Sequence, residues 1–510
     1  MDLSGKIGNP TLENVRQSLA LPADAGPLTV LNRGGGVLFP YLHGYAAAGE
    51  VLEALPNDEW RRSETVMGVV VAFLAKQGHA ARAKAYLSAS NLKFEKTYYF
   101  EFSRLCLALH LGEDVEEQDL EVWRRLERQL PVTDLLLQGL YYNCMLVMNV
   151  RLGHPKAART AAQHAVSCFR EARHSYLEHF IHIHLADLDV LEGHLKSAGR
   201  NLASAESCLS TAAVRYANES AVIEVIRLAI AYEQGKLEVV GPKSRELRLK
   251  LVTGDSWSEL FCELARISVL STYFLHGLRP ALKELEDFKA DYARRHGEYA
   301  ATLELLAAFL AHLEWQPSEA EQIFQRSGGI SSPNSIGGIL RAQLAVALGT
   351  ETSADPIAEA PRLRIIAALQ SARMSRGAKR RSMIERALRD AAQEGQIAPF
   401  LEHRDAFIGV STKLAGGQFA KGDRRLIYFT TRVLKAVEQS YVVPAPLERF
   451  GFNRRQYRVA AALQSGATNK QVARQLGVSE ATVKYHLTAL YRMSGKSRRS
   501  EFIDFMHEIE

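Results

Sequence analysis

The sequence predicts an all-α protein, in which a solenoid of helical repeats is followed by a C-terminal domain of four helices. Glycine turns that recur about every 40 residues predict the solenoid. Helix caps on either side of a glycine turn near the C-terminus predict the four-helix domain. No strand-like alternation competes with this pattern. The chain has 510 residues, 47% hydrophobic and 24% charged, an ordinary balance for a globular protein.

The repeat is marked by short turns between helical stretches. These turns lie at Gly78, Gly112, Gly153, Gly193, Gly235 and Gly277, with Gln316-Pro317 in the equivalent place of the next unit. Around most turns an apolar helix precedes the glycine, and a second helix follows that carries a small residue such as Ala158 or Ala198. One helical pair cannot bury its apolar face alone, so neighbours must stack into a superhelix with a concave groove. This spacing is typical of tetratricopeptide-like repeats.

The chain divides into five expected segments. They are an irregular helical N-terminal cap at 1–60, a tetratricopeptide-like repeat solenoid at 61–325, further helical repeats or a connector at 326–440, a linker at 441–450 and a helix-turn-helix domain at 451–510. Pro444 and Pro446 mark the linker, because prolines break the preceding helix and set the last domain apart.

The solenoid also contains candidate ligand-binding residues. We identify Tyr98, Tyr99, Tyr141, Tyr142, His179 and His182 as a candidate ligand groove. The tyrosines can line a pocket for a small aromatic or sugar-like molecule, but helix-spaced aromatics more often belong to a core, so both interpretations stay open. His179 and His182 share a helical face beside Glu178. Without a further cysteine or carboxylate partner in the pattern, no metal site is predicted.

The segment from Asn453 onward carries the signals of a helix-turn-helix. Asn453 with Gln456, and Thr468 with Gln471, are capping pairs that open two helices, and Ser479 caps a third. The predicted core is formed by Val459, Leu463, Val472, Leu476, Val483, Leu487 and Leu490, which follow helical spacing. The turn between the second and third helices falls at Gly477.

The third helix presents a polar and basic outer face. This face consists of Ala481, Lys484, Tyr485, Thr488 and Arg492. Such a face suits the major groove, where Lys484 can reach a guanine edge. Backbone N–H groups at Asn469 and Lys470, at the start of the preceding helix, can hold a phosphate. The alternative is the solvated face of an ordinary three-helix domain, but caps, turn and basic face together favour DNA.

The charge distribution favours the same interpretation. Residues 451–510 contain ten Lys or Arg against five Asp or Glu, a net charge of +5, whereas the whole chain carries +6. The basic excess therefore lies in the closing segment, as expected for a module that contacts phosphates.

The segment from Phe452 to about Met506 resembles the C-terminal effector domain of LuxR-type transcription regulators. The likeness rests on the run from Thr468-Asn469-Lys470 to Ala473 and on Thr482-Val483-Lys484-Tyr485-His486. The resemblance implies phosphate contacts from Thr468, Asn469, Lys470 and Thr482, and base reading by Lys484, Tyr485 and Thr488. The full set of predicted DNA-binding residues is Thr468, Asn469, Lys470, Ser479, Thr482, Lys484, Tyr485, Thr488 and Arg492.

This chain also departs from the family pattern. Gln456 and Arg458 stand where the family usually has glutamates, and Ala489 stands where asparagine is common. A fourth helix is expected from Arg498 onward, and it forms the dimer contact in the family. Its apolar residues Phe502, Phe505, Met506 and Ile509 can instead pack within the same domain, so both alternatives stay open.

A second stretch, from Ala387 to Leu401, resembles the region before the DNA module in the MalT-like branch of these regulators. That branch normally begins with a nucleotide-binding ATPase domain. This sequence has no Gly-x-x-x-x-Gly-Lys-Ser/Thr loop, so neither that domain nor ATP or another cofactor is expected. A signal would then enter through the solenoid itself.

The remaining features predict a cytoplasmic protein that is not an enzyme. The five cysteines are widely spaced in helical patterns and indicate no disulfide framework. The N-terminus lacks the plan of a signal peptide, and no apolar stretch is long enough for a membrane span. Sequence motifs of hydrolases and phosphate-binding enzymes are missing.

Together these patterns predict a sequence-specific DNA-binding transcription regulator. Its expected partners are double-stranded DNA, a small-molecule or protein effector in the repeat groove, RNA polymerase as a further candidate, and a second copy in a homodimer, with no membrane. The effector would control dimerisation or exposure of the DNA-binding domain. The alternative is a solenoid adaptor, a protein-interaction scaffold whose C-terminal domain does not bind DNA specifically.

Overall fold

A computed structural model describes most of the chain. The described residues are 11–56, 63–77, 79–89, 98–111, 115–212, 219–253, 257–296, 300–314, 316–328, 335–350, 360–375, 377–407, 414, 417–443, 447, 449–464, 467–476 and 478–509. Over these ranges the chain forms helices and turns and no strand, which confirms the predicted all-α class.

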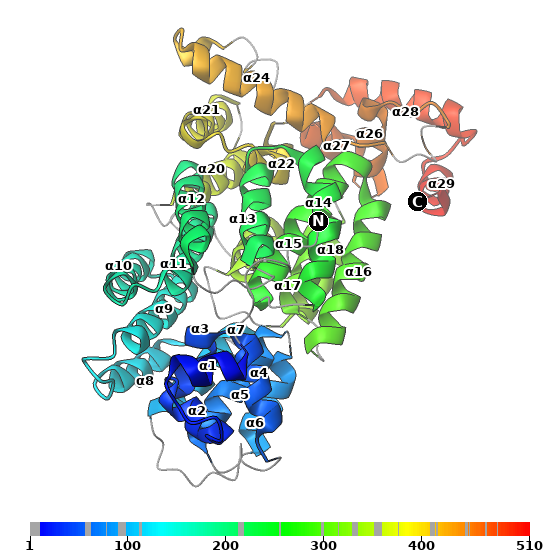
Figure 1. The fold of residues 1–510 in the computed structure, drawn as a ribbon. Helices are drawn as coiled ribbons and strands as arrows, with labels where there is room; N and C mark the ends of the chain where they lie inside the picture. The colour runs from blue at the N-terminus through cyan, green and yellow to red at the C-terminus, as the bar shows by residue number, and fades with distance from the viewer. Residues whose placement is uncertain are drawn as a thin grey trace.

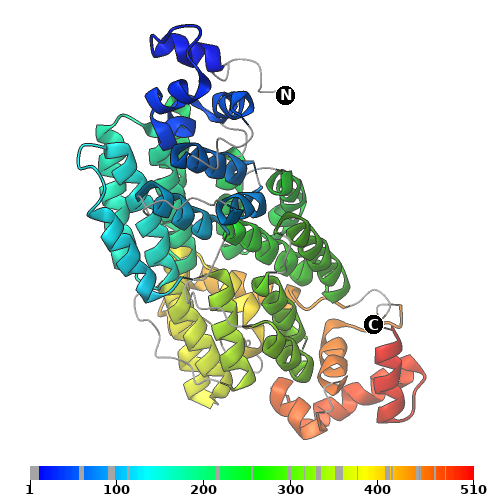
Figure 2. The same cartoon turned by 90° about the horizontal axis from the view of Figure 1, so that it is seen from below.

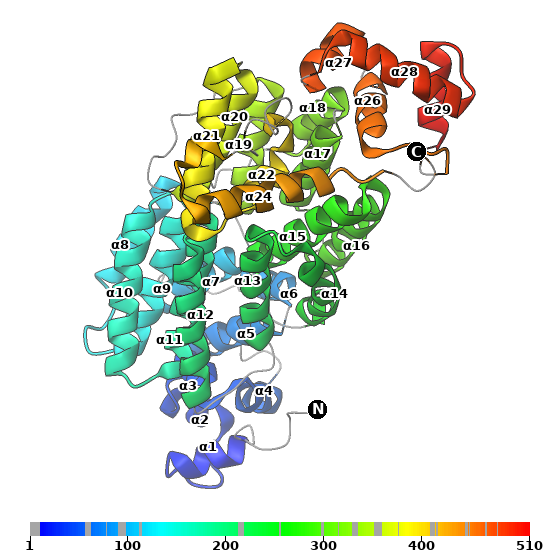
Figure 3. The ribbon, with the colours of Figure 1, turned by 90° about the horizontal axis from the view of Figure 1, so that it is seen from above.

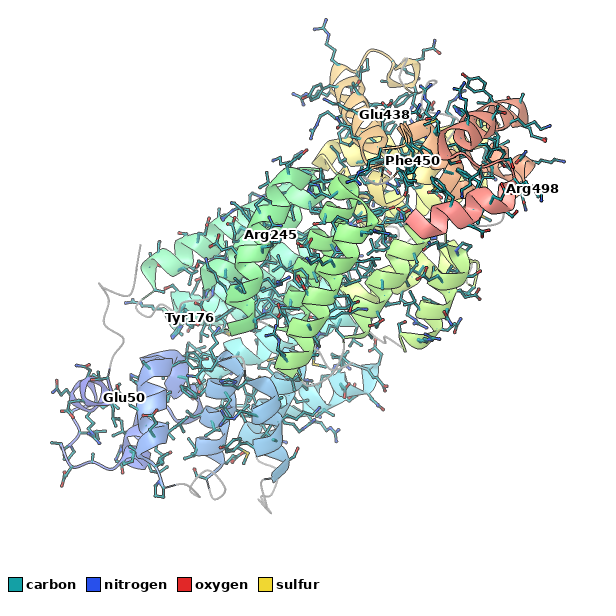
Figure 4. The ribbon with its side chains drawn as sticks, turned by 90° about the vertical axis from the view of Figure 1, so that its right-hand side faces the viewer. Glu50, Tyr176, Arg245, Glu438, Phe450 and Arg498 are labelled. Atoms are coloured by element: carbon teal, nitrogen blue, oxygen red, sulfur yellow. The ribbon has the colours of Figure 1, made fainter. Side chains whose placement is uncertain are left out.

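The N-terminal helices form a small unit with its own core at one end of the molecule (Figure 1). They are α1 (Leu12–Ser18), α2 (Pro27–Arg33), the 3-10 turn η1 (Gly36–Leu38), α3 (Phe39–His43) and α4 (Tyr45–Ala54). This unit contains Glu50, which lies at the opposite end of the molecule from Arg498 in the C-terminal domain (Figure 4).

Seven helical hairpins follow and stack into a curved array (Figures 2 and 3). The pairs are α5 (Glu64–Lys76) with α6 (Ala80–Ala89), α7 (Tyr98–Leu111) with α8 (Glu117–Glu127), α9 (Leu135–Arg151) with α10 (Pro155–Glu171), α11 (Ser175–Glu192) with α12 (Leu195–Thr211), α13 (Glu219–Glu233) with α14 (Leu237–Thr253), α15 (Ser258–His276) with α16 (Leu278–His296), and α17 (Ala301–Leu313) with α18 (Pro317–Arg326).

The remaining helices form a connector and the C-terminal domain. The connector comprises α19 (Ile336–Leu348), α20 (Pro361–Met374), α21 (Gly377–Glu394), α22 (Ala398–Glu402), the 3-10 turns η3 (Arg404–Phe407) and η4 (Gln418–Ala420), and α24 (Arg424–Gln439). The domain comprises α26 (Arg454–Gln464), α27 (Asn469–Leu476), α28 (Glu480–Ser494) and α29 (Arg499–Ile509). The linker prolines Pro444 and Pro446 lie outside the described residues.

Glycines in the repeat turns allow the chain to reverse sharply and the connector to approach the backbone closely. Gly193 and Gly235 adopt positive φ values of 89° and 73°, which only glycine accepts at little cost. The connector lies directly against these two turns. Gln396 Nε2 donates to the Gly193 carbonyl at 2.5 Å, and a Cβ at Gly235 would lie 2.8 Å from Ile397. Gly78 and Gly112 lie outside the described residues.

A buried ion-pair network fastens the connector to the array. Arg362 of α20 donates to Glu233 of α13 at 3.0 Å and to Glu402 of α22 at 2.9 Å. Arg266 of α15 bonds the same two glutamates, at 3.3 and 3.1 Å, and also Glu263 at 2.8 Å. All five side chains are at most 8% exposed. Each charge therefore depends on its partners, because water cannot replace them.

Substitution of Arg362 by methionine should destabilise the protein strongly. Removing one partner leaves buried carboxylates uncompensated, at a cost of about 3–5 kcal/mol. The matched control is Arg381→Met, which breaks a surface pair between an exposed arginine and the half-buried Glu385 and should cost less than about 1 kcal/mol. Urea denaturation followed by circular dichroism measures both. Equal stability of the two variants would show that the network does not hold the connector in place.

Candidate nucleic-acid interface

Helix caps fix the two helices that form the candidate interface. Thr468 and Gln471 bond reciprocally, with the Thr468 N–H donating to Gln471 Oε1 at 2.7 Å and the Gln471 N–H donating to Thr468 Oγ1 at 3.3 Å. Ser479 Oγ accepts from the Thr482 N–H at 3.0 Å. Both predicted caps are thus formed. The glycine predicted for the turn between them, Gly477, lies outside the described residues.

The core of the domain is the one that helical spacing predicts. The predicted core residues are all buried, namely Val459, Leu463, Val472, Leu476, Val483, Leu487 and Leu490. Phe502, Phe505 and Met506 of α29 join the same core. For these three residues the structure therefore favours packing within the domain over a dimer contact. The side chain of Ile509 lies outside the described part.

The outer face of α28 is open to solvent. The Lys484 side chain is 66% exposed and Tyr485 is 73% exposed, while Thr488 and Arg492 are also exposed. Lys484 Nζ lies 3.5 Å from Glu480 Oε1, a solvent-exposed pair that contributes little and can open. Figures 1 and 3 show α28 on the outer side of the domain, with α26 toward the solenoid. Within the described part of the chain, the outer face of α28 is thus left uncovered.

The start of α27 combines free backbone donors with positive charge. Thr468 and Lys470 are exposed, and Asn469 is half-buried. Arg499 of α29 donates to Asn469 Oδ1 at 3.1 Å and to the Ala467 carbonyl. Its guanidinium therefore adds positive charge beside the N-terminus of α27, where an anion is favoured. Sequence reasoning missed Arg499, although its place in the basic run Arg498-Arg499 was a signal.

A hydrogen bond and a cation–π contact join this domain to the last hairpin of the array and to Tyr441, which follows α24. Tyr457 of α26 donates its hydroxyl to Glu314 at 3.1 Å, and Tyr273 of α15 donates to the other oxygen of Glu314 at 2.5 Å. Arg458 lies 4.4 Å from the ring centre of Tyr441, a cation–π distance. Arg458 is one of the departures from the family pattern, and here it serves the contact between the two parts.

The residues predicted for a ligand groove lie in separate environments. Tyr141 is buried and Tyr142 is half-buried, and both donate hydroxyls to Glu127, at 3.3 and 3.0 Å. His179 is fully buried, and burial lowers its pKa to about 3. His182 lies 3.4 Å from Glu178. The side chains of Tyr98 and Tyr99 lie outside the described part.

One cluster near these histidines combines three kinds of metal donor. Donor atoms of Glu178, His182 and Cys208 lie within 4.8 Å of one another. Cys208 comes from α12 and is the cysteine partner that the sequence pattern did not reveal. Arg170 already pairs with Glu178 at 2.8 Å, and burial raises the pKa of the Cys208 thiol to about 11. Both features oppose binding of a cation.

The caps, the shared core and the exposed basic face define a helix-turn-helix module that can read DNA. Residues 452–505 match the family model of GerE, bacterial regulatory proteins of the luxR family. This segment is therefore a LuxR-type helix-turn-helix domain, and it supports a DNA-binding transcription regulator. No curated protein and no solved structure is significantly similar to the chain. Within the described residues, no helix has the length and apolar character needed to cross a membrane.

Substitution of Lys484 by alanine should weaken binding to specific DNA. A contact to a base edge contributes about 1–3 kcal/mol, which corresponds to roughly 5- to 150-fold in affinity. Lys435→Ala removes the same charge from an exposed position on α24 and should change affinity less than about twofold. Fluorescence anisotropy with DNA from the upstream region of the gene, across a salt series, measures both variants. Equal losses would exclude base reading by Lys484.

Proposed function

We propose that this protein is a transcription regulator whose helical-repeat region senses an effector and thereby controls how its C-terminal domain engages DNA. The observation that carries the proposal is the match of residues 452–505 to the luxR family, in a domain whose recognition face is exposed. The contacts assigned to Thr468, Lys470, Thr482, Lys484, Tyr485 and Thr488 belong to this proposal. Such a regulator acts on double-stranded DNA in the cytoplasm.

The helical hairpins support a tetratricopeptide-like array of the MalT-like kind. Gly153, Gly193, Gly235 and Gly277 each follow the first helix of a pair within two residues and have positive φ. Gln316 precedes α18 in the equivalent place. A stack of such pairs forms an extended binding surface, because each unit must bury its apolar face against the next. The array is therefore the part of the chain that we assign to effector binding.

Regulation by this array acts on the orientation of the DNA-binding domain. Because α28 is exposed, the solenoid does not need to uncover it. The contacts of Tyr457 with Glu314 and of Arg458 with Tyr441 instead hold the domain at one angle to the array. In a homodimer, that angle sets the spacing of two recognition helices on two half-sites. An effector changes DNA affinity to the extent that it binds the two orientations differently.

Loosening this junction should change binding to paired half-sites. Tyr457→Phe removes the hydrogen bond to Glu314 and keeps the ring in the core, a change of about 1 kcal/mol or roughly fivefold in affinity. We expect tighter binding to DNA with two half-sites and unchanged binding to a single half-site. The substitution changes only how the two DNA-binding domains of a homodimer are placed relative to each other. Anisotropy titrations with both DNAs measure this effect.

The matched control is Tyr428→Phe, which alters an exposed tyrosine on α24 that is 68% accessible. It should leave both titrations unchanged. If Tyr457→Phe also leaves both unchanged, the junction does not control the domain. If the protein binds no DNA specifically while Lys484→Ala leaves its protein partners bound, the solenoid adaptor becomes the better description.

A further inference from the structure

A cavity of about 240 Å³ lies where the N-terminal unit, the first hairpins and α15 meet. Its apolar wall is contributed by η1, α5, α7 and α9, through side chains such as Leu38, Val71, Phe102 and Leu140. A cavity of about 150 Å³ accommodates benzene. The space is therefore sufficient for one or two rings with a short chain. Among the described side chains predicted for the ligand groove, Tyr141, Tyr142, His179 and His182, none lines it.

Charged side chains also line the cavity, and three of them form an acidic cluster. This cluster consists of Asp187 of α11 and Glu259 and Glu263 of α15. Glu259 pairs with Arg151 at 2.8 Å, and Glu263 pairs with Arg266 at 2.8 Å. Lys76, which also lines the cavity, pairs with Glu219 at 3.3 Å. Asp187 alone among these charged groups makes no ion pair or hydrogen bond within the described part of the chain.

Three further groups at the cavity select the kind of ligand that fits. The amide Oδ1 of Asn143 is buried and accepts no hydrogen bond from any described residue. His184 lies 5.3 Å from the Trp257 ring, and burial with the charge of Arg151 lowers its pKa to about 4, so the imidazole is neutral at pH 7. The Trp257 face attracts a cation. The free acceptor of Asn143, the neutral His184 and the Trp257 ring thus line the same cavity as Asp187.

We propose that this cavity binds a small primary amine with an aromatic body, whose ammonium group pairs with Asp187 and donates to Asn143 while its ring packs on the apolar wall. The inference rests on the proposed function, because it names the chemical class of the effector that the array would sense. An alcohol of the same shape lacks the charge, and a carboxylate of that shape would be repelled by the acidic cluster.

Protonation of Asp187 predicts the pH dependence of this binding. Burial, with Glu263 and Glu259 nearby, raises its pKa to about 8, against an opposing effect of Arg266. Below that pH the empty cavity holds a neutral carboxyl, and binding of an ammonium releases its proton to solvent. Affinity should therefore rise about tenfold per pH unit up to pH 8 and level off above it, while the amine stays protonated. The neutral His184 and the ion-paired Arg151 and Lys76 also line the cavity.

The experiment uses the full-length protein with 2-phenylethylamine and tryptamine as probes and 2-phenylethanol as the uncharged match. Isothermal titration calorimetry at pH 6.5, 7.5 and 8.5 gives the affinity and, in buffers of different ionisation enthalpy, the protons released. We expect an amine to bind at least about tenfold more tightly than the alcohol. If neither amine exceeds the alcohol at pH 8.5, the inference is overturned.

Two variants locate the bound amine. Asp187→Asn should weaken amine binding roughly 10- to 100-fold and abolish proton release, while leaving alcohol binding unchanged. Glu238→Gln, an exposed carboxylate on α14, should change neither. If the Asp187→Asn variant does not fold, the affinities of the unaltered protein for the amine and for the alcohol still test whether the cavity binds an amine. If an amine binds as expected but leaves the affinity of the protein for DNA unchanged, the amine site is supported. That outcome refutes only the proposal that the array senses this ligand.

Discussion

Two buried arginines hold three glutamates where the chain folds back on itself, and the rest of the molecule is arranged around that network. Glu233, Glu263 and Arg266 belong to the hairpin array, whereas Arg362 and Glu402 belong to the connector. Buried charges of this kind require partners at short distance. Once these charges pair, α20 and α22 lie against the turns that follow α11 and α13. This placement in turn sets where α24 and the DNA-binding domain lie (Figure 3).

The same network forms part of a continuous path of contacts from the cavity to the DNA-binding domain. Glu263 lines the cavity and pairs with Arg266, which bonds Glu402. Two residues further on, Arg404 lies 4.2 Å from the Tyr441 ring, and Arg458 of α26 lies 4.4 Å from that ring. Side-chain contacts therefore link Glu263 to Glu402 and Arg404 to Arg458, and the backbone from Glu402 to Arg404 joins the two sets.

Local signals allowed much of the fold to be predicted. The capping pair of Thr468 with Gln471 and the cap at Ser479 lie within three residues of their partners, so their chemistry can be recognised without a structure. The glycines at 193 and 235 are also recognisable as turns. Their contact with the connector could not be recognised, because Gln396 and Ile397 lie more than 150 positions further along the chain. Arg458 is similar: the sequence marks it as a departure, and only Tyr441 explains it.

The sequence by itself determined the helices, their pairing into hairpins, and the exposed face of α28 that carries Lys484 and Tyr485. These follow from caps, turns and the helical period, which act within one or two turns of helix. The tertiary structure alone decided the ion network, the junction at Glu314 and the cavity with Asp187. Each of these gathers residues from several hairpins, and long-range packing sets which helical faces meet. The ligand groove predicted from aromatic residues stays a prediction, and the cavity could not be recognised without the structure.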